Sequence, residues 1–170
     1  ILKWAETSDG FISPLKNNTG RPFWISNKYT RQIVHKWRSQ ENAILVGSKT
    51  YITDNPILDS RNWNNNNPQR FIIAGNNKIQ NKRFDIIRHN KTLSVDNINQ
   101  ILFEKNIQSI LVEGGKKTLE TFIKSGCWDE ARIIKNEKKI NNGIRSPILN
   151  SKINNVHKVD DDLIQTYFNQ

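Results

Sequence analysis

Short apolar runs alternate along this chain with segments whose apolar residues recur at helical spacing. Short apolar runs are typical of strands covered on both faces of a sheet, and they lie within residues 43–47, 70–75 and 109–113. Two segments, 26–40 and 116–125, each have one apolar helical face. We expect Ser26 to cap the first of these helices and Gly126 to end the second. The alternation predicts an α/β fold with a largely parallel central sheet.

Weaker patterns add further elements to this order. Residues 1–5, 84–88 and 128–135 are expected to be strands, residues 11–12 are extended, and Asp96 opens another helix. A final segment reads as two strands joined by a turn, which adds an antiparallel edge at the C-terminus. That segment is 157–168, with its turn at 160–162.

Two stretches in the middle of the chain carry no clear periodic pattern. Residues 49–61 are expected to be irregular, with a turn at Asn55–Pro56. Residues 64–67 are four consecutive asparagines in a chain that contains 24 of them. Such a run indicates a polar surface loop and a drift in composition, and it specifies no sharper structure.

Composition limits the classes of function more than it selects one. At 170 residues we expect a single domain, with no internal repeat. The net charge of +10 invites a nucleic-acid partner, but the 26 basic residues are scattered and no run exceeds two. One cysteine and three separated histidines give no metal-ligand pattern, so we expect no metal. No signal peptide or membrane span is visible, which favours a cytoplasmic location.

A carboxylate and two glycines stand where a predicted buried strand gives way to a helix. In the run "ILVEGGKK", Glu113 ends the strand, and Gly114 and Gly115 precede the helix. The glycines could allow a phosphate to approach bare backbone at a helix N-terminus, or they could form a tight turn. Glu113 could anchor the helix terminus or face a ligand. Neither a dinucleotide-binding GxGxxG nor a P-loop is present.

Other residues are unusual for their predicted positions. Lys3 is a cation within a strand, and it needs an acidic partner or a polar ligand if that face is enclosed. Arg38 ends the first helix and Arg61 follows the Asn55–Pro56 turn; each alone could be solvated, whereas together they could bind one anion. Trp24 could belong to the core.

These segments together resemble a known enzyme family. "LKWAETSDGFIS", "WIS", "WRSQENAILVGSKTYITDNPILDSR" and "ILVEGGKKTLETFI" occur in the order and at the separations found in the reductase domain of bacterial riboflavin biosynthesis. That domain is usually the C-terminal half of a bifunctional deaminase/reductase, and the resemblance runs from about Leu2 to Arg132. Dihydrofolate reductase is a more distant relative with the same fold and a Gly-Gly pair at the same strand end.

The resemblance implies a dihydrofolate-reductase-like fold, a homodimer, NADPH as hydride donor and a phosphorylated ribosylaminopyrimidine as substrate. It implies that Lys3 and Glu113 act on the substrate's ribose, and that Arg38, Leu58 and Arg61 contact the substrate. The positions that it implies for the cofactor are Ala5, Trp24, Ser26, Thr50, Asp54, Gly75, Gly114, Gly115, Lys116, Lys117 and Thr118. The family's zinc deaminase domain has no counterpart here, so residues 1–170 are expected to be the reductase domain alone.

The chain also departs from the family at several positions. Pro22 stands where relatives have a small polar substrate contact, and Glu6 replaces a smaller residue beside the cofactor. Gly75 replaces a frequent serine, and Asn77 and Lys78 are the local candidates for holding the adenosine 2′-phosphate.

Three other functions are alternatives to this one. A related reductase acts on the diaminopyrimidinone before deamination, and sequence does not separate the two substrates. A nucleic-acid-binding module would need a contiguous basic surface. A non-catalytic scaffold for a deaminase would not need to retain Lys3, Asp54, Arg61 and Glu113 together.

Overall fold

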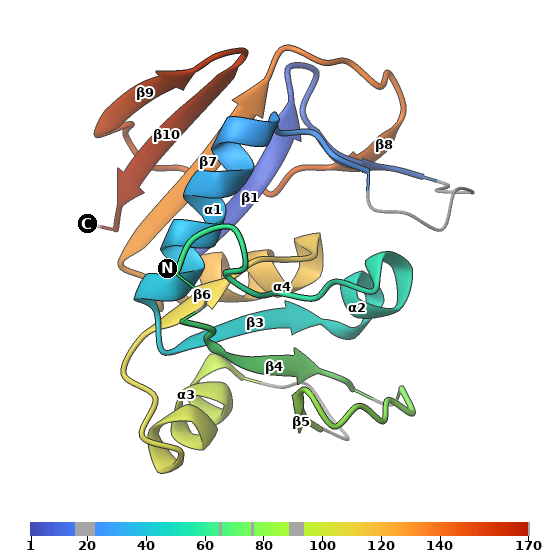
Figure 1. The fold of residues 1–170 in the computed structure, drawn as a ribbon, viewed down its shortest axis with the longest axis vertical. Helices are drawn as coiled ribbons and strands as arrows, with labels where there is room; N and C mark the ends of the chain where they lie inside the picture. The colour runs from blue at the N-terminus through green and yellow to red at the C-terminus, as the bar shows by residue number, and fades with distance from the viewer. Residues whose placement is uncertain (16–22, 65, 76, 89–93, 170) are drawn as a thin grey trace.

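The described residues of this computed structural model, 1–15, 23–64, 66–75, 77–88 and 94–169, form ten strands and four helices (Figure 1). The strands are β1 (Leu2–Thr7), β2 (Phe11–Pro14), β3 (Ala43–Gly47), β4 (Gln69–Ile73), β5 (Asp85–Ile87), β6 (Ile110–Val112), β7 (Glu130–Asn136), β8 (Gly143–Arg145), β9 (Asn155–Val159) and β10 (Asp162–Phe168). The helices are α1 (Lys28–Gln40), α2 (Ser48–Asp54), α3 (Val95–Glu104) and α4 (Lys116–Ser125).

Eight strands form one sheet in the order β5-β4-β3-β6-β1-β7-β10-β9, and β2 pairs with β8 separately. Every pair from β5 to β7 is parallel, whereas β10 runs antiparallel to both β7 and β9. The predicted α/β class, with a mostly parallel central sheet and an antiparallel C-terminal hairpin, is therefore confirmed. The parallel part is buried because crossover helices cover both of its faces.

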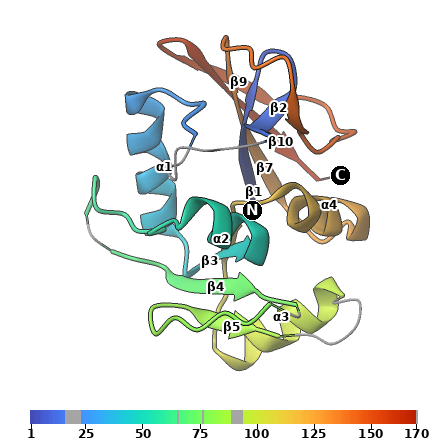
Figure 2. The ribbon, with the colours of Figure 1, turned by 90° about the vertical axis from the view of Figure 1, so that its right-hand side faces the viewer.

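The two faces of the sheet are covered by different elements (Figure 2). On one face, α1 packs its Val34 against Ile134 and Ile164 of the strands β7 and β10. On the other face, α3 and α4 bury Ile98 and Leu119 in the largest apolar cluster, which also includes Leu2 and Trp4 of β1. Because side chains alternate along a strand, Lys3 and Ala5 point to the opposite face, beneath α1.

One predicted irregular segment is helical, and one predicted cap is displaced by a residue. Helix α2 overlaps the first part of the segment expected to be irregular, and its C-cap is Asn55, which adopts a left-handed conformation. Its seven residues bury no side chain and include β-branched residues of modest helix propensity, so no apolar face marked it. The N-cap of α1 is Asn27 instead of Ser26, and its Oδ1 accepts hydrogen bonds from the backbone of Tyr29 and Thr30.

The turn of the C-terminal hairpin is bound to the start of α1. The fully buried Asp162 accepts hydrogen bonds from the backbone N–H of Asn27 (2.9 Å) and from Nδ2 of Asn136 (2.6 Å). The side chain of Asn27 also donates to the carbonyl of Val159 at 2.7 Å. One asparagine therefore caps the helix and joins it to the antiparallel edge of the sheet.

None of the helices in the described part of the chain combines the length and the apolar character needed to cross a membrane.

Replacing Asp162 by asparagine tests this junction. An asparagine offers one carbonyl oxygen to two buried donors, so one donor loses its acceptor, and we expect a loss of about 1–3 kcal/mol in unfolding free energy. The matched control is Asp160→Asn in the same turn, where the left-handed backbone tolerates asparagine. Denaturant unfolding measures the free energy of unfolding of both variants. Equal values for the two would contradict the role given to Asp162.

Candidate active site

Lys3, Arg38 and Glu113 meet on the sheet face beneath α1. Strands β1 and β6 are adjacent and pair Leu2 with Val112, which brings the next residues, Lys3 and Glu113, side by side. Nε and Nη2 of Arg38 donate to the two carboxylate oxygens of Glu113 at 2.8 and 2.7 Å. Nζ of Lys3 lies 3.7 Å from Oε2 of the same carboxylate. The structure thus supplies the acidic partner that the sequence requires for Lys3.

The protonation states of this cluster follow from its burial. The Glu113 side chain is only 6% exposed, and burial by itself would raise its pKa. The charges of Arg38 and Lys3 outweigh that effect and hold the pKa of Glu113 at about 2. Burial lowers the pKa of Lys3, although Glu113 opposes the shift, and Arg38 lowers it further. Glu113 is therefore a fixed carboxylate, and Lys3 is the member of the pair whose pKa is lowered.

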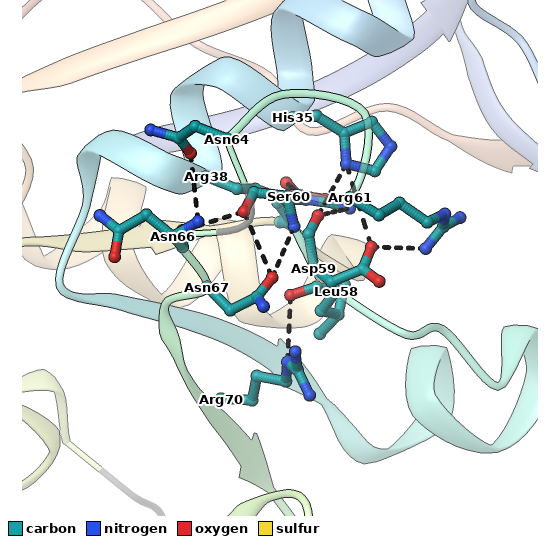
Figure 3. A network of polar contacts seen from close by, with 11 residues as sticks. His35, Arg38, Leu58, Asp59, Ser60, Arg61, Asn64, Asn66, Asn67 and Arg70 are labelled. Atoms are coloured by element: carbon teal, nitrogen blue, oxygen red, sulfur yellow. Dashed lines mark hydrogen bonds and ion pairs between the residues drawn. The ribbon is translucent and has the colours of Figure 1, made fainter.

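The two arginines of the predicted site do not share an anion in this structure. Arg38 binds Glu113, whereas Arg61 binds the carboxylate of Asp59 (Figure 3). The Asp59 carbonyl accepts hydrogen bonds from Nδ1 of His35 at 2.7 Å and from Nη1 of Arg38 at 3.2 Å. Burial lowers the pKa of His35, against the effect of this backbone hydrogen bond. The loop that carries Arg61 is therefore attached to the helix that carries Arg38.

Sequence reasoning missed His35 and Asp59. Neither residue was singled out from the sequence, where the histidines gave only the absence of a metal-ligand pattern. A usable signal was present for His35, since it lies three residues before Arg38 and so shares its helix face. No local pattern marks Asp59. The neighbouring Leu58, predicted to contact substrate, has its side chain buried against Ile44 and Val46.

The glycine junction after β6 forms a close three-way contact. The N–H of Gly47, at the end of β3, donates to the carbonyl of Gly114 at 2.9 Å. A methyl group added to Gly47 would lie 2.6 Å from Oγ1 of Thr118, and one added to Gly115 would lie 2.8 Å from Oγ1 of Thr50. Gly114 has a φ of 136°, which only glycine adopts readily. The tight-turn interpretation is therefore correct for Gly114.

The same junction leaves the N-terminus of α4 bare. Gly115 is its N-cap, and no side chain of the described residues caps its first turn. Such N–H groups are a ready site for an anion. Lys117 lies in this first turn, and the ammonium of Lys116 lies 3.6 Å from Glu120 one turn later. The bare helix N-terminus and the lysine in its first turn both suit the approach of a phosphate.

The remaining predicted cofactor positions lie on several elements. Trp24 is 52% exposed, with Arg31 over its ring at 4.9 Å, so it does not belong to the core. Ser26 is buried, and its carbonyl accepts a hydrogen bond from Arg31 at 3.0 Å. Lys138 ties this segment to the end of β7 by donating to the carbonyl of Ile25 at 2.7 Å. Ala5 is partly buried against the apolar cluster under α1.

Asp54 and Gly75 lie near the strand ends. Asp54 is the last residue of α2, where burial raises the pKa of its carboxyl. Gly75 follows β4 with a positive φ, and Nδ2 of Asn77 donates to Oγ of Ser48 at 2.8 Å. Lys78 is exposed.

Two of the departures from the family pattern need separate mention. Glu6 lies on the face of β1 opposite Lys3, where its carboxylate accepts a hydrogen bond from the Trp4 indole at 2.9 Å. Lys135 pairs with the same carboxylate at 3.2 Å. Pro22 lies outside the described residues.

A parallel α/β sheet with a buried lysine–carboxylate pair and a bare helix N-terminus at its strand ends defines a ligand-binding domain of the α/β enzyme class. The chain belongs to the RibD C-terminal domain family, whose model matches residues 1–138. Its structural neighbours are RibD reductase domains, and the fold is the dihydrofolate-reductase-like fold that the resemblance implies.

Individual relatives agree with this assignment. The riboflavin biosynthesis protein RibD of Aquifex aeolicus is 30% identical over 156 residues, which cover 75% of this chain and 43% of that protein. A solved deaminase/5-amino-6-(5-phosphoribosylamino)uracil reductase from Thermotoga maritima is 26% identical, with a TM-score of 0.83 over 99% of this chain and 56% of its own. The riboflavin biosynthesis reductase Rib7 of Saccharomyces cerevisiae, 20% identical, shares the fold with a TM-score of 0.73 over 98% of this chain and 87% of its own. This chain thus spans less than half the length of the Aquifex relative.

Acid titration tests the charge cluster. The pKa of Glu113 is depressed in the folded state, so its contribution to stability is complete above its ordinary pKa of 4.5 and is lost as pH falls toward about 2. We expect Glu113→Gln to be less stable at neutral pH by roughly 3 kcal/mol, with the difference shrinking across that window.

Unfolding free energies measured between neutral pH and pH 2 check this expectation. The control is Glu137→Gln, which changes an exposed carboxylate and should follow the native curve. A stability difference for Glu113→Gln that stays constant with pH would contradict the assignment.

Proposed function

We propose that this chain reduces the ribose C1′ of 5-amino-6-(5-phosphoribosylamino)uracil with NADPH, giving the ribitylamino product of riboflavin biosynthesis. The observation that carries the proposal is the buried Lys3–Glu113–Arg38 cluster, next to the bare glycine junction, in a member of the RibD C-terminal domain family. Substrate and cofactor can then be held on the two sides of one strand end. Positioning of this kind supplies most of the rate enhancement that hydride transfer needs.

The protonation states divide the work between the two reactive side chains. Opening the ribose breaks the bond from C1′ to the ring oxygen and places a proton on that oxygen. C1′ is left in a protonated imine, which keeps its N–H and becomes the amine when it accepts the hydride. Glu113 has no proton to give, because its pKa is about 2, so it serves as an acceptor that orients sugar hydroxyls. Lys3, whose pKa is lowered by burial, is the group that delivers the proton. Arg38 keeps the Glu113 carboxylate in place for both events.

The glycine junction fits a dinucleotide. A side chain on Gly47 or Gly115 would collide with Thr118 or Thr50, so both positions need glycine for this close packing beside α4. The cofactor's phosphates would be held by the N–H groups of the first turn of α4, together with Lys117. NADPH supplies the hydride when bound. Asn77 and Lys78 remain the candidates for the adenosine 2′-phosphate.

Arg61, Leu58 and the partners implied by the resemblance remain predictions. We propose that Arg61 exchanges its bond to Asp59 for the substrate's phosphate, since its side chain is 46% exposed. The homodimer and a linked deaminase domain are proposed from the family. The diaminopyrimidinone that has not been deaminated is the alternative substrate, because the same residues would serve it.

Oxidation of NADPH, followed by absorbance with each of the two pyrimidines offered separately, tests the activity. We expect turnover with the deaminated substrate. Turnover with only the diaminopyrimidinone would support the alternative reductase, and none with either would refute both. Equal rates with NADH would show that the 2′-phosphate is not recognised.

Substitution of Lys3 tests the proton delivery. Lys3→Met keeps the length of the side chain and leaves Glu113 paired with Arg38, so we expect normal folding and a loss of at least about 100-fold in kcat, the lower end for general acid–base catalysis. Steady-state kinetics and a thermal unfolding curve provide the measurement. Lys158→Met on the exposed strand β9 is the control and should keep native turnover. Near-native kcat in Lys3→Met would remove Lys3 from the chemistry.

Substitution of Gly115 tests the cofactor half of the site. In Gly115→Ala the new methyl group displaces Thr50 and narrows the junction, so we expect KM for NADPH to rise about tenfold or more, a cost near 1.4 kcal/mol. The KM for the pyrimidine, measured at saturating NADPH, is the internal control and should change less than twofold. An equal rise in both KM values would show that the junction does not serve the cofactor specifically.

A further inference from the structure

We propose that Asn66 and Asn67, in the asparagine run after Arg61, position the substrate loop, with Asn67 as the principal positioning residue. The substrate loop is defined here as residues 58–61. The inference rests on the proposed function for the loop's contact with substrate. It gives a role to a run that composition alone marks only as polar and exposed.

The central anchor of the substrate loop is Ser60, which is fully buried (Figure 3). Its backbone N–H donates to Oδ1 of Asn67 at 2.9 Å. Its hydroxyl lies 2.9 Å from the carbonyl of Asn66 and 3.2 Å from the same Asn67 oxygen. Because a buried N–H without an acceptor is costly, Asn67 determines where the backbone between Asp59 and Arg61 lies.

The asparagine run is itself attached to α1. Nδ2 of Asn66 donates to the carbonyl of Ser39 at 2.9 Å, one residue after Arg38. The N–H of Asn66 also donates to Oδ1 of Asn64 at 3.1 Å. The run thus bridges the end of α1 and the substrate loop.

Three further hydrogen bonds hold the substrate loop. His35 and Arg38 both donate to the carbonyl of Asp59, and Nε of Arg70 donates to the carbonyl of Leu58 at 3.2 Å. The loop is therefore held by side chains from α1, from β4 and from the asparagine run. Arg38 binds both the carboxylate of Glu113 and the carbonyl of Asp59, and the carboxylate of Asp59 pairs with Arg61. By holding Ser60 between Asp59 and Arg61, Asn67 therefore keeps Arg61 in a fixed position relative to the charge cluster.

The test compares two asparagines of the same segment. Asn67→Ala removes the acceptor for Ser60, whereas Asn62→Ala is the control, since the exposed side chain of Asn62 makes no hydrogen bond with the described residues. We expect KM for the phosphorylated pyrimidine to rise roughly 3- to 10-fold in Asn67→Ala, the equivalent of one hydrogen bond, with KM for NADPH changed less than twofold. The control should retain both native values.

Amide hydrogen exchange at Ser60 and Arg61, measured by NMR without substrate, supplies a second readout that does not depend on turnover. Faster exchange in Asn67→Ala alone supports the anchoring, even if no pyrimidine is reduced and the proposed function fails. If Asn67→Ala does not fold, Ser60→Ala is the second variant. It keeps the backbone hydrogen bond from Ser60 to Asn67 and removes only the hydroxyl, so it should show a smaller increase in amide exchange. Exchange and KM values equal to those of the control would overturn the proposal. So would a parallel rise in both KM values with a lower unfolding temperature, because that pattern indicates a general loss of stability.

Discussion

The buried bidentate pair between Arg38 and Glu113 is the interaction on which the site depends. Both side chains are almost fully enclosed, and each would be very costly there without the other. Lys3 lies beside the same carboxylate, so two basic side chains share one acidic partner in a poorly solvated place. An anionic phosphorylated sugar would supply the charge that this arrangement lacks. The cluster is thus poor evidence for stability and better evidence for a ligand.

Helix α1 connects this cluster to the parts of the molecule that surround it. Its start is capped by Asn27, which joins the C-terminal hairpin through Asp162. Its end carries Arg38, which reaches both Glu113 and the carbonyl of Asp59. Because the helix packs its apolar face on β7 and β10, its position along the sheet is set by burial, and the polar contacts at its two ends inherit that position. A shift of α1 would therefore disturb the charge cluster and the substrate loop together.

The sequence is informative wherever one residue's neighbours along the chain decide its environment. Strand β3 and helix α4 were predicted at their observed bounds because unbroken apolar runs and a glycine stop are local signals. Helix α2 had no such signal, since it buries nothing. Glu113 could be singled out as a charge after an apolar run, but its pairing with Arg38 spans 75 positions and no local pattern encodes it. The role of the asparagine run could not be predicted for the same reason. Its partners Ser60 and Ser39 come close to it only once the chain has folded.

Two parts of the site are held by different kinds of hydrogen bond. The floor consists of Glu113 and Gly114, and the walls are the substrate loop and the segment at Trp24. The difference decides which parts can change when residues are substituted. Glu113 and Gly114 are fixed by backbone hydrogen bonds to β3, through the carbonyl of Leu45 and the N–H of Gly47, which do not depend on side-chain identity. The substrate loop and the segment at Trp24 are held mainly by side chains, namely Asn67, His35, Lys138 and Arg31. Substitutions in the walls can therefore change the shape of the site while the backbone of Glu113 and Gly114 stays in place. A site divided in this way allows one fold to serve closely related ligands.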